Sequence, residues 1–250
     1  MQPIVALNQK CAKNKKKIKK SLIATSPRKY TNPIYRQIPV QVKYTFYSDA
    51  AGSSCRFQQS YLDNQTGDRG VSCIGIINNK LLWLCQLFWP VVFLTKTCDG
   101  KGVPYGCKSE TLEAIGLLLP FLCIPKHICG HSILFKIDNM SVVTQFYKKR
   151  NGFKQNNFYN STLHILSLVK FLASKLNVVV HVQYIPRISN KWSTLVDHLS
   201  RKSTTNSFDL FLIQNAECIL YNGVFFEWLN NPKHVYDLPS KLLDEIKSTL

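Results

Sequence analysis

Four carboxylates of this chain occur in contexts that suit metal binding: Asp49, Glu113, Asp138 and Asp197. Asp49 ends an alternating run, 40–47, that predicts a strand, and small residues follow it. A carboxylate at a strand end, next to residues that let a ligand come close, suits a metal that must touch a substrate. The competing interpretation is a strand that simply runs into a turn, because turns favour the same residues.

The contexts of the other three carboxylates support the metal interpretation. Glu113 lies in an apolar segment, 112–123, that predicts a buried helix, where a carboxylate needs a partner, a metal or a proton. Asp138 ends a short apolar strand and precedes a helix, so we expect it at the carboxyl edge of a sheet. Asp197 lies on a late helix.

Such a cluster would need cations, because neighbouring carboxylates raise one another's pKa. Two Mg²⁺ ions about 3.5–4 Å apart would neutralise the cluster and clamp a phosphodiester. One ion would generate the hydroxide nucleophile, and the other would stabilise the leaving 3′ oxygen. Mg²⁺ suits carboxylate, water and phosphate ligands, and Mn²⁺ could substitute for it.

The elements that must position these residues are first a meander of strands and then alternating helices and strands. The expected strands are 40–47, 71–77, 80–88, 132–137 and 178–185, with a hairpin turn at Asn78-Asn79. The expected helices are 112–123, with Ser109 as its N-cap, then 140–149, 161–176, 190–200 and 241–248. This order predicts an α/β fold with a mixed five-stranded sheet, three antiparallel strands and then parallel strands, flanked by helices.

The charge distribution indicates a basic arm before the folded part. The net charge of +18 favours a polyanionic partner, with nucleic acid ahead of an anionic membrane. The run 13–20 contains six lysines and is predicted to be disordered. It could contact nucleic acid, act as a nuclear-import signal or be a solvated tail. The predicted divisions are an arm, a folded domain and a C-terminal extension, at 1–39, 40–202 and 203–250.

Cysteine content and hydropathy indicate an intracellular protein. Nine cysteines, with no apolar segment typical of a signal peptide before them, suggest reduced thiols in the nucleus or cytoplasm. The longest apolar run, 81–94, is interrupted by Gln86 and Pro90 and is too short for a membrane span. We therefore expect no membrane partner.

One cluster of potential zinc ligands is interpreted as structural. Cys123, His127, Cys129 and His131 crowd one loop, but their Cys-x₃-His-x-Cys-x-His spacing is not a usual zinc pattern. A helix end, a loop and a strand start explain these residues better than a metal site.

The carboxylate motifs resemble the ribonuclease H domain attached to retroelement reverse transcriptases, particularly those of DIRS-like elements. The resemblance spans about 44–201 and is carried by Ser48-Asp49-Ala50-Ala51, Lys108-Ser109-Glu110-Thr111-Leu112-Glu113-Ala114-Ile115-Gly116-Leu117-Leu118, Ile137-Asp138-Asn139 and Val196-Asp197-His198-Leu199-Ser200-Arg201. It implies a ribonuclease H-like fold, in which the first and fourth strands are neighbours. It also implies that Asp49, Glu113, Asp138 and Asp197 are the catalytic metal ligands.

The function implied by this resemblance is metal-dependent hydrolysis of the RNA strand of RNA–DNA hybrids during reverse transcription. A reverse transcriptase polymerase domain is a candidate partner, although this chain has no Tyr-x-Asp-Asp polymerase motif. An inactive module of the same fold, which only binds nucleic acid or protein, is the alternative. A DNA-cutting transposase or resolvase is weaker, because those enzymes usually carry other carboxylate spacings and large appended domains.

The chain departs from the family pattern at three points. Ala51 stands where the family often has Ser, and Arg187 follows Pro186 where many relatives have Gly. No obvious histidine occupies the loop directly before the helix that carries Asp197, where some relatives have one. The family's Glu-x-x-Ala pattern, with a small residue three positions on, favours Glu113 over Glu110 as the metal ligand. Glu110 could instead support the helix N-terminus.

The candidate nucleic-acid contacts are Asn139, Lys148, Lys149, Arg150, Lys154 and Arg187. Asn139 follows Asp138 directly and could contact the hybrid backbone or a 2′-hydroxyl beside the scissile bond. It could equally cap the next helix. The basic residues past that helix could hold phosphates of the DNA strand.

Overall fold

The computed structural model describes residues 41–51, 66–90, 109–148, 162–187, 190–201, 207–230 and 238–250. The chain divides into two units, 1–39 and 40–250, and every described residue belongs to the second. The predicted basic arm therefore lies outside the described residues. No helix in the described ranges is long and apolar enough to cross a membrane.

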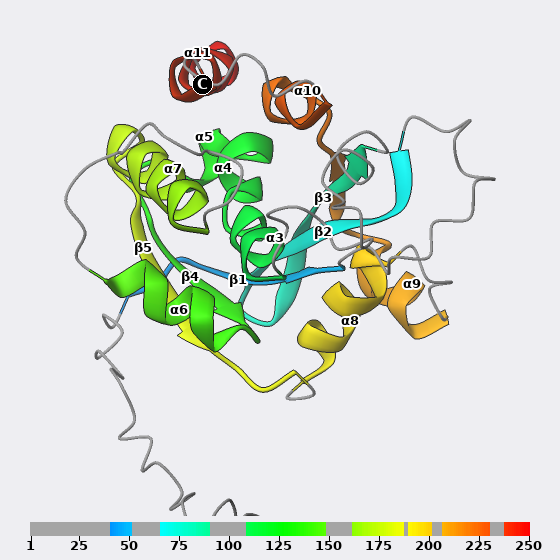
Figure 1. Cartoon of the computed structure of the whole chain (residues 1–250). Helices are drawn as coiled ribbons and strands as arrows, with labels where there is room; N and C mark the ends of the chain where they lie inside the picture. The colour runs from blue at the N-terminus through cyan, green and yellow to red at the C-terminus, as the bar shows by residue number, and fades with distance from the viewer. Residues whose placement is uncertain are drawn as a thin grey trace, which may run out of the picture. The chain divides into compact units, whose positions relative to one another are not determined.

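A six-stranded mixed sheet forms the centre of the second unit, with the strand order β5-β4-β1-β2-β3-β6 (Figure 1). The strands are β1 Tyr44–Ala50, β2 Thr66–Ile77, β3 Lys80–Pro90, β4 Ser132–Ile137, β5 Val179–Tyr184 and β6 Glu217–Leu220. The first three form an antiparallel meander, and β4 pairs parallel with β1 and with β5. The predicted order of antiparallel and then parallel strands is confirmed, as is the adjacency of the first and fourth strands.

The sheet has six strands instead of the predicted five, because β6 pairs parallel with the outer edge of β3. Its four residues, Glu-Cys-Ile-Leu, are mostly exposed. Such a short edge strand, held mainly by its main-chain pairing, shows no alternation of apolar and polar residues in its sequence. The segment after residue 202 thus contributes a strand to the central sheet.

The meander differs from the prediction at its ends. β1 starts at Tyr44 and continues through Asp49 to Ala50, because Asp49 and Ala50 pair with Ser72 and Val71 of β2. β2 itself extends back to Thr66, where it pairs with the end of β3. The polar composition of 66–70 concealed that extension. The hairpin turn is confirmed, since Asn78 and Asn79 have φ values of 47° and 62°, as its left-handed conformation requires.

Helices cover both faces of the sheet (Figure 1). One face packs against α3 Ser109–Gly116, α4 Leu119–Cys123, α5 Pro125–Ile128, α6 Met140–Tyr147, α7 Thr162–Lys175, α10 Val224–Asn230 and α11 Leu238–Thr249. The other face packs against α8 Lys191–Ser200, with α9 Ser207–Ile213 beside it. Side chains alternate along β1, so Phe46 enters the first core and Tyr47 the second.

The single helix predicted over 112–123 is wrong, because the segment forms successive short helices. It begins as α3 at Ser109, which is its first helical residue. A break follows Gly116, and Pro120 and Pro125 each stand in the first turn of a new helix. Proline suits that position because its missing N–H would have no helical acceptor there.

Candidate active site

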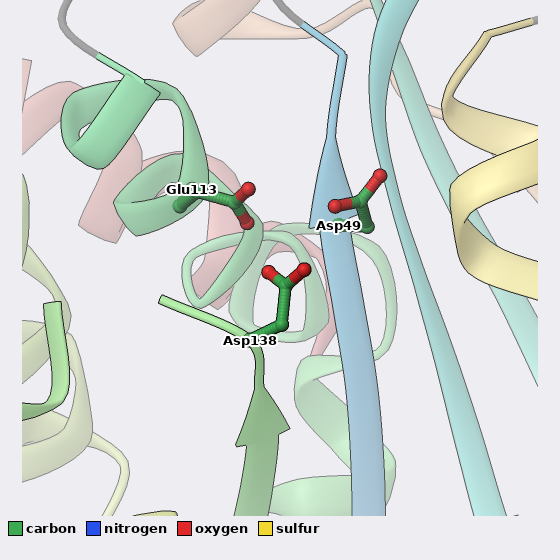
Figure 2. Close-up of side chains that lie close together, drawn as sticks. All are labelled: Asp49, Glu113 and Asp138. Atoms are coloured by element: carbon green, nitrogen blue, oxygen red, sulfur yellow. The ribbon is translucent and has the colours of Figure 1, made fainter. Parts of the chain in front are cut away.

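Three of the four predicted carboxylates meet at one edge of the sheet. Carboxylate oxygens of Asp49, Glu113 and Asp138 lie within 4.8 Å of one another (Figure 2). Asp49 lies near the end of β1, and Asp138 directly follows β4. Because these strands are parallel neighbours, their carboxyl ends meet at the same edge. Glu113 reaches the same point from α3 (Figure 2).

Gly116 explains how α3 brings Glu113 so close. A Cβ atom at Gly116 would overlap the hydroxyl of Ser48 and lie 3.1 Å from Val71 Cγ2. The absence of a side chain therefore lets α3 lie directly against β1 and β2. Residues three apart share one face of a helix, so Glu113 also faces the sheet. Glu110 is only half-buried and is not part of the cluster.

Burial and mutual repulsion raise the pKa values of these carboxyls. Burial raises the pKa of Asp49 to about 6, and the charges of Asp197 and Asp138 add to this effect. Burial and the charge of Asp49 also raise the pKa of Glu113 well above its usual range. The pKa of Asp138 is raised by burial, against the opposing charge of Arg187.

The donor set of this cluster fits a hard divalent cation. The Oε2 atom of Glu113 is buried and has no hydrogen-bond partner among the residues that the structure describes. A buried carboxylate oxygen without a donor is costly unless a cation or a proton satisfies it. Three carboxylates that approach one point are typical ligands for Mg²⁺ or Mn²⁺.

Asp197 lies outside this cluster, bound to two arginines. Its Oδ1 accepts hydrogen bonds from Arg201 Nη2 at 2.8 Å and Nε at 3.2 Å, and from Arg187 Nη2 at 2.8 Å. Burial would raise the pKa of Asp197, but the hydrogen bonds from Arg201 and Arg187 lower it to about 2. The Nε atom of Arg187 also lies 3.6 Å from Asp138 Oδ2, so Arg187 links the fourth carboxylate to the cluster.

The predicted nucleic-acid contacts are only partly described. Asn139 caps α6, because its Oδ1 accepts hydrogen bonds from the backbone N–H groups of Ser141 at 3.1 Å and Val142 at 3.2 Å. Lys148 is exposed and follows directly after α6. The other basic candidates after this helix lie outside the described residues: Lys149, Arg150 and Lys154.

Two further residues near the cluster were missed by the sequence analysis. Lys136 lines a pocket beside Asp49 and Asp138, and its Nζ lies 3.4 Å from the hydroxyl of Tyr47. Its position on β4, two residues before Asp138, was a usable signal, since such residues share one face of a strand. Ser200, one turn after Asp197 on α8, donates a hydrogen bond to Asp49 Oδ2 at 2.9 Å.

The histidines of the 123–131 loop pack against aromatic side chains. His127 lies against Trp83, with ring centroids 5.0 Å apart, and His131 lies edge-on to Tyr44 at 5.8 Å. Within the described residues, the acidic cluster is the one group of three or more His, Cys, Asp or Glu side chains close enough to share an ion.

No protein-family model matches the chain, and no curated protein matches it. Among solved structures, the N-terminal RNase H domain of a Mycobacterium tuberculosis protein, fused to maltose binding protein, is similar at 15% identity and a TM-score of 0.40, over 65% of this chain and 94% of that chain. RNase H1 of the archaeon Halobacterium salinarum is similar at 11% identity and a TM-score of 0.39, over 62% of this chain and 93% of that chain. LC11-RNase H1, isolated from compost, is similar at 12% identity and a TM-score of 0.39, over 65% of this chain and 96% of that chain.

The fold is ribonuclease H-like. An antiparallel β1–β3 meander, a parallel β1–β4 pair and a parallel β5 form its sheet, with helices on both faces. This is the arrangement implied by the motif resemblance, and β6 is an addition at its edge.

Proposed function

We propose that this chain is a metal-dependent endonuclease that hydrolyses the RNA strand of RNA–DNA hybrids. One observation carries the proposal: the carboxylates of Asp49, Glu113 and Asp138 converge at the carboxyl edge of β1 and β4, and one buried Glu113 oxygen there has no described partner. A ribonuclease H-like sheet with acidic ligands at this edge supports phosphodiester hydrolysis better than simple binding.

Asp49, Glu113 and Asp138 would hold Mg²⁺, with Mn²⁺ as a substitute. Asp197 would join them as a ligand for a second ion, through a carboxylate that is already ionised. The bound ions would supply positive charge for the phosphodiester transition state and an activated water as nucleophile.

The chain's own cations would bind and orient the substrate. The Arg187 side chain is 57% exposed beside the cluster, so its guanidinium is accessible to a phosphate. Lys136 and Lys148 would add positive charge nearby, and Lys149, Arg150 and Lys154 would extend it. Asn139 already uses its Oδ1 as a cap, so it would contact a 2′-hydroxyl or the backbone through its amide N–H group.

The biological setting in this proposal is retroelement reverse transcription, beside a polymerase domain. The DIRS-like motifs around the four carboxylates support it. The basic arm would strengthen binding to nucleic acid, and the 13–20 run would serve as an import signal for a nuclear enzyme. A cytoplasmic site of action is the other setting.

A cleavage assay on three matched duplexes tests the proposed substrate. Hybrid, duplex RNA and duplex DNA of one sequence are incubated with the full chain and Mg²⁺. We expect cuts in the RNA strand of the hybrid alone. Preferential cleavage of duplex DNA would instead indicate a transposase-like or resolvase-like activity.

The alternative is an inactive module that binds nucleic acid or protein. The two arginines on Asp197 favour it, because they occupy one oxygen of the fourth predicted ligand. This alternative predicts hybrid binding without cleavage in either Mg²⁺ or Mn²⁺.

A further inference from the structure

A row of polar residues crosses three strands beside the acidic cluster. Asp49 on β1 is opposite Ser72 on β2, and Ser72 is opposite Gln86 on β3. Residues at opposed positions of neighbouring strands project from the same face of a sheet. Ser72 is fully buried, and the face on which this row lies is the one that α8 covers.

The last turn of α8 is hydrogen-bonded to this row at two points. Ser200 Oγ donates to Asp49 Oδ2 at 2.9 Å. The amide nitrogen of Gln86 donates to Ser72 Oγ and to the backbone carbonyl of Leu199, both at 3.2 Å. The Leu199 carbonyl is among the last of the helix, so no N–H group of the same helix donates to it. Gln86 supplies the missing hydrogen-bond donor.

The environment of Ser200 makes its hydrogen bond to Asp49 selective for one carboxyl orientation. Ser200 is 0% exposed and Asp49 is 4% exposed, so water cannot readily replace the hydroxyl as the donor. Figure 2 shows one oxygen of Asp49 directed toward Glu113 and Asp138 and the other directed away from them, on the side of α8. Rotation of the carboxyl group out of its plane would break the bond from Ser200 to Asp49 and leave the hydroxyl with its second acceptor, the Asp197 backbone carbonyl oxygen at 3.0 Å.

We propose that Ser200, supported by Gln86 and Ser72, is a positioning residue that holds Asp49 with one oxygen toward the metal ligands. The inference rests on the proposed function as a metal-dependent nuclease. Ser200 is not itself a ligand in this scheme. It acts through Asp49, as hydrogen-bonding partners of metal ligands generally do when they fix ligand orientation.

Calorimetric titration of the full chain with Mn²⁺, without nucleic acid, tests this role. We expect Ser200→Ala to raise the Kd for Mn²⁺ about tenfold, which is the lower end of the usual effect of such partners. In hybrid cleavage it should lower kcat with little change in KM. Ser167→Ala is the matched control, since Ser167 on α7 donates only to its own helix, to the Leu163 carbonyl at 2.7 Å. It should leave the Kd unchanged.

A second variant keeps the test decisive if Ser200→Ala fails to fold. Gln86→Met keeps the length of the side chain but removes both donors, and it should raise the Kd in the same direction by a smaller factor. Circular dichroism in EDTA reports folding separately. A lower unfolding temperature with a wild-type Kd in the folded variants would overturn the inference. The hydrogen bonds would then serve only to hold α8 against the sheet. Absence of Mn²⁺ binding by the wild type would instead overturn the proposed function itself.

Discussion

Arg187 Nη2 donates a hydrogen bond to Asp197 Oδ1 at 2.8 Å, so a residue that departs from the family pattern contacts the last of the predicted metal ligands. Arg201 shares the same acceptor oxygen from one helical turn away. Asp197 therefore remains ionised to low pH, and its negative charge holds a guanidinium at the rim of the acidic cluster. An exposed guanidinium in that position can exchange its carboxylate for a phosphate.

Replacement of Arg187 tests this exchange. Arg187→Gln should weaken hybrid binding several-fold and reduce the slope of log affinity against log salt by about one, because one phosphate contact is lost. Filter binding or fluorescence anisotropy across a salt series measures both. Lys126→Gln, on α5, removes a charge away from the cluster and is the control. An unchanged slope in Arg187→Gln would show that this arginine serves only Asp197.

The raised pKa of Asp49 predicts a pH-dependent stability in the absence of metal. Burial raises this pKa from 3.8 to about 6, so between these values the folded chain holds a proton that the unfolded chain has lost. The free energy of unfolding therefore falls as pH rises through this window, by on the order of 3 kcal/mol from this group. Urea unfolding of the wild type and Asp49→Asn in EDTA should show the wild type losing stability relative to the variant from about pH 4 to pH 6.

Metal should reverse this loss. Above pH 6 the Asp49 carboxyl is ionised, so Mg²⁺ should raise the unfolding temperature of the wild type more at pH 8 than at pH 5. Asp49→Asn should show little of this increase. A stability difference between wild type and variant that stays constant with pH would contradict the burial of an ionisable group at this position.

The close packing of α3 on β1 gives a prediction about stability. Gly116→Ala should destabilise the fold by about 1–3 kcal/mol, because the new methyl group overlaps the Ser48 hydroxyl. Chemical denaturation measures the loss. Adding Ser48→Ala should restore part of it, since the two changes share one contact. If the losses of stability in the two single variants simply add in the double variant, the overlap with the Ser48 hydroxyl is not the cause of the destabilisation.

Much of the acidic cluster could be predicted from local pattern. Asp49 and Asp138 each end a patterned strand, and parallel pairing of the two strands brings them together. Burial distinguished Glu113 from Glu110, and Gly116 gives the physical reason. The strand ends and the buried helix depend on residue type and spacing within one segment. The pairing of β1 with β4 was predicted only through the motif resemblance, because it joins distant segments.

The remaining features depend on contacts between distant segments. The contact from Arg187 to Asp197 depends on where the segment that ends at residue 187 meets α8. The bond from Ser200 to Asp49 likewise joins residues far apart in the chain. The alignment of Asp49, Ser72 and Gln86 in one row depends on the register of β1, β2 and β3. That register is determined by the pairing of whole strands and not by the residues of any one strand. Strand β6 escaped prediction because its exposed residues show no alternation.

The central claim is metal-dependent cleavage of the RNA strand by the acidic cluster, and one measurement tests it most directly. The rate of RNA-strand cleavage in a labelled hybrid is compared for the wild type and Asp49→Asn in Mg²⁺, with hybrid affinity measured in parallel. We predict cleavage by the wild type, at least a thousandfold loss in the variant (about 4 kcal/mol of transition-state stabilisation), and equal affinities, because basic residues supply the binding. Equal cleavage by both proteins, or loss of binding together with cleavage, would contradict the account.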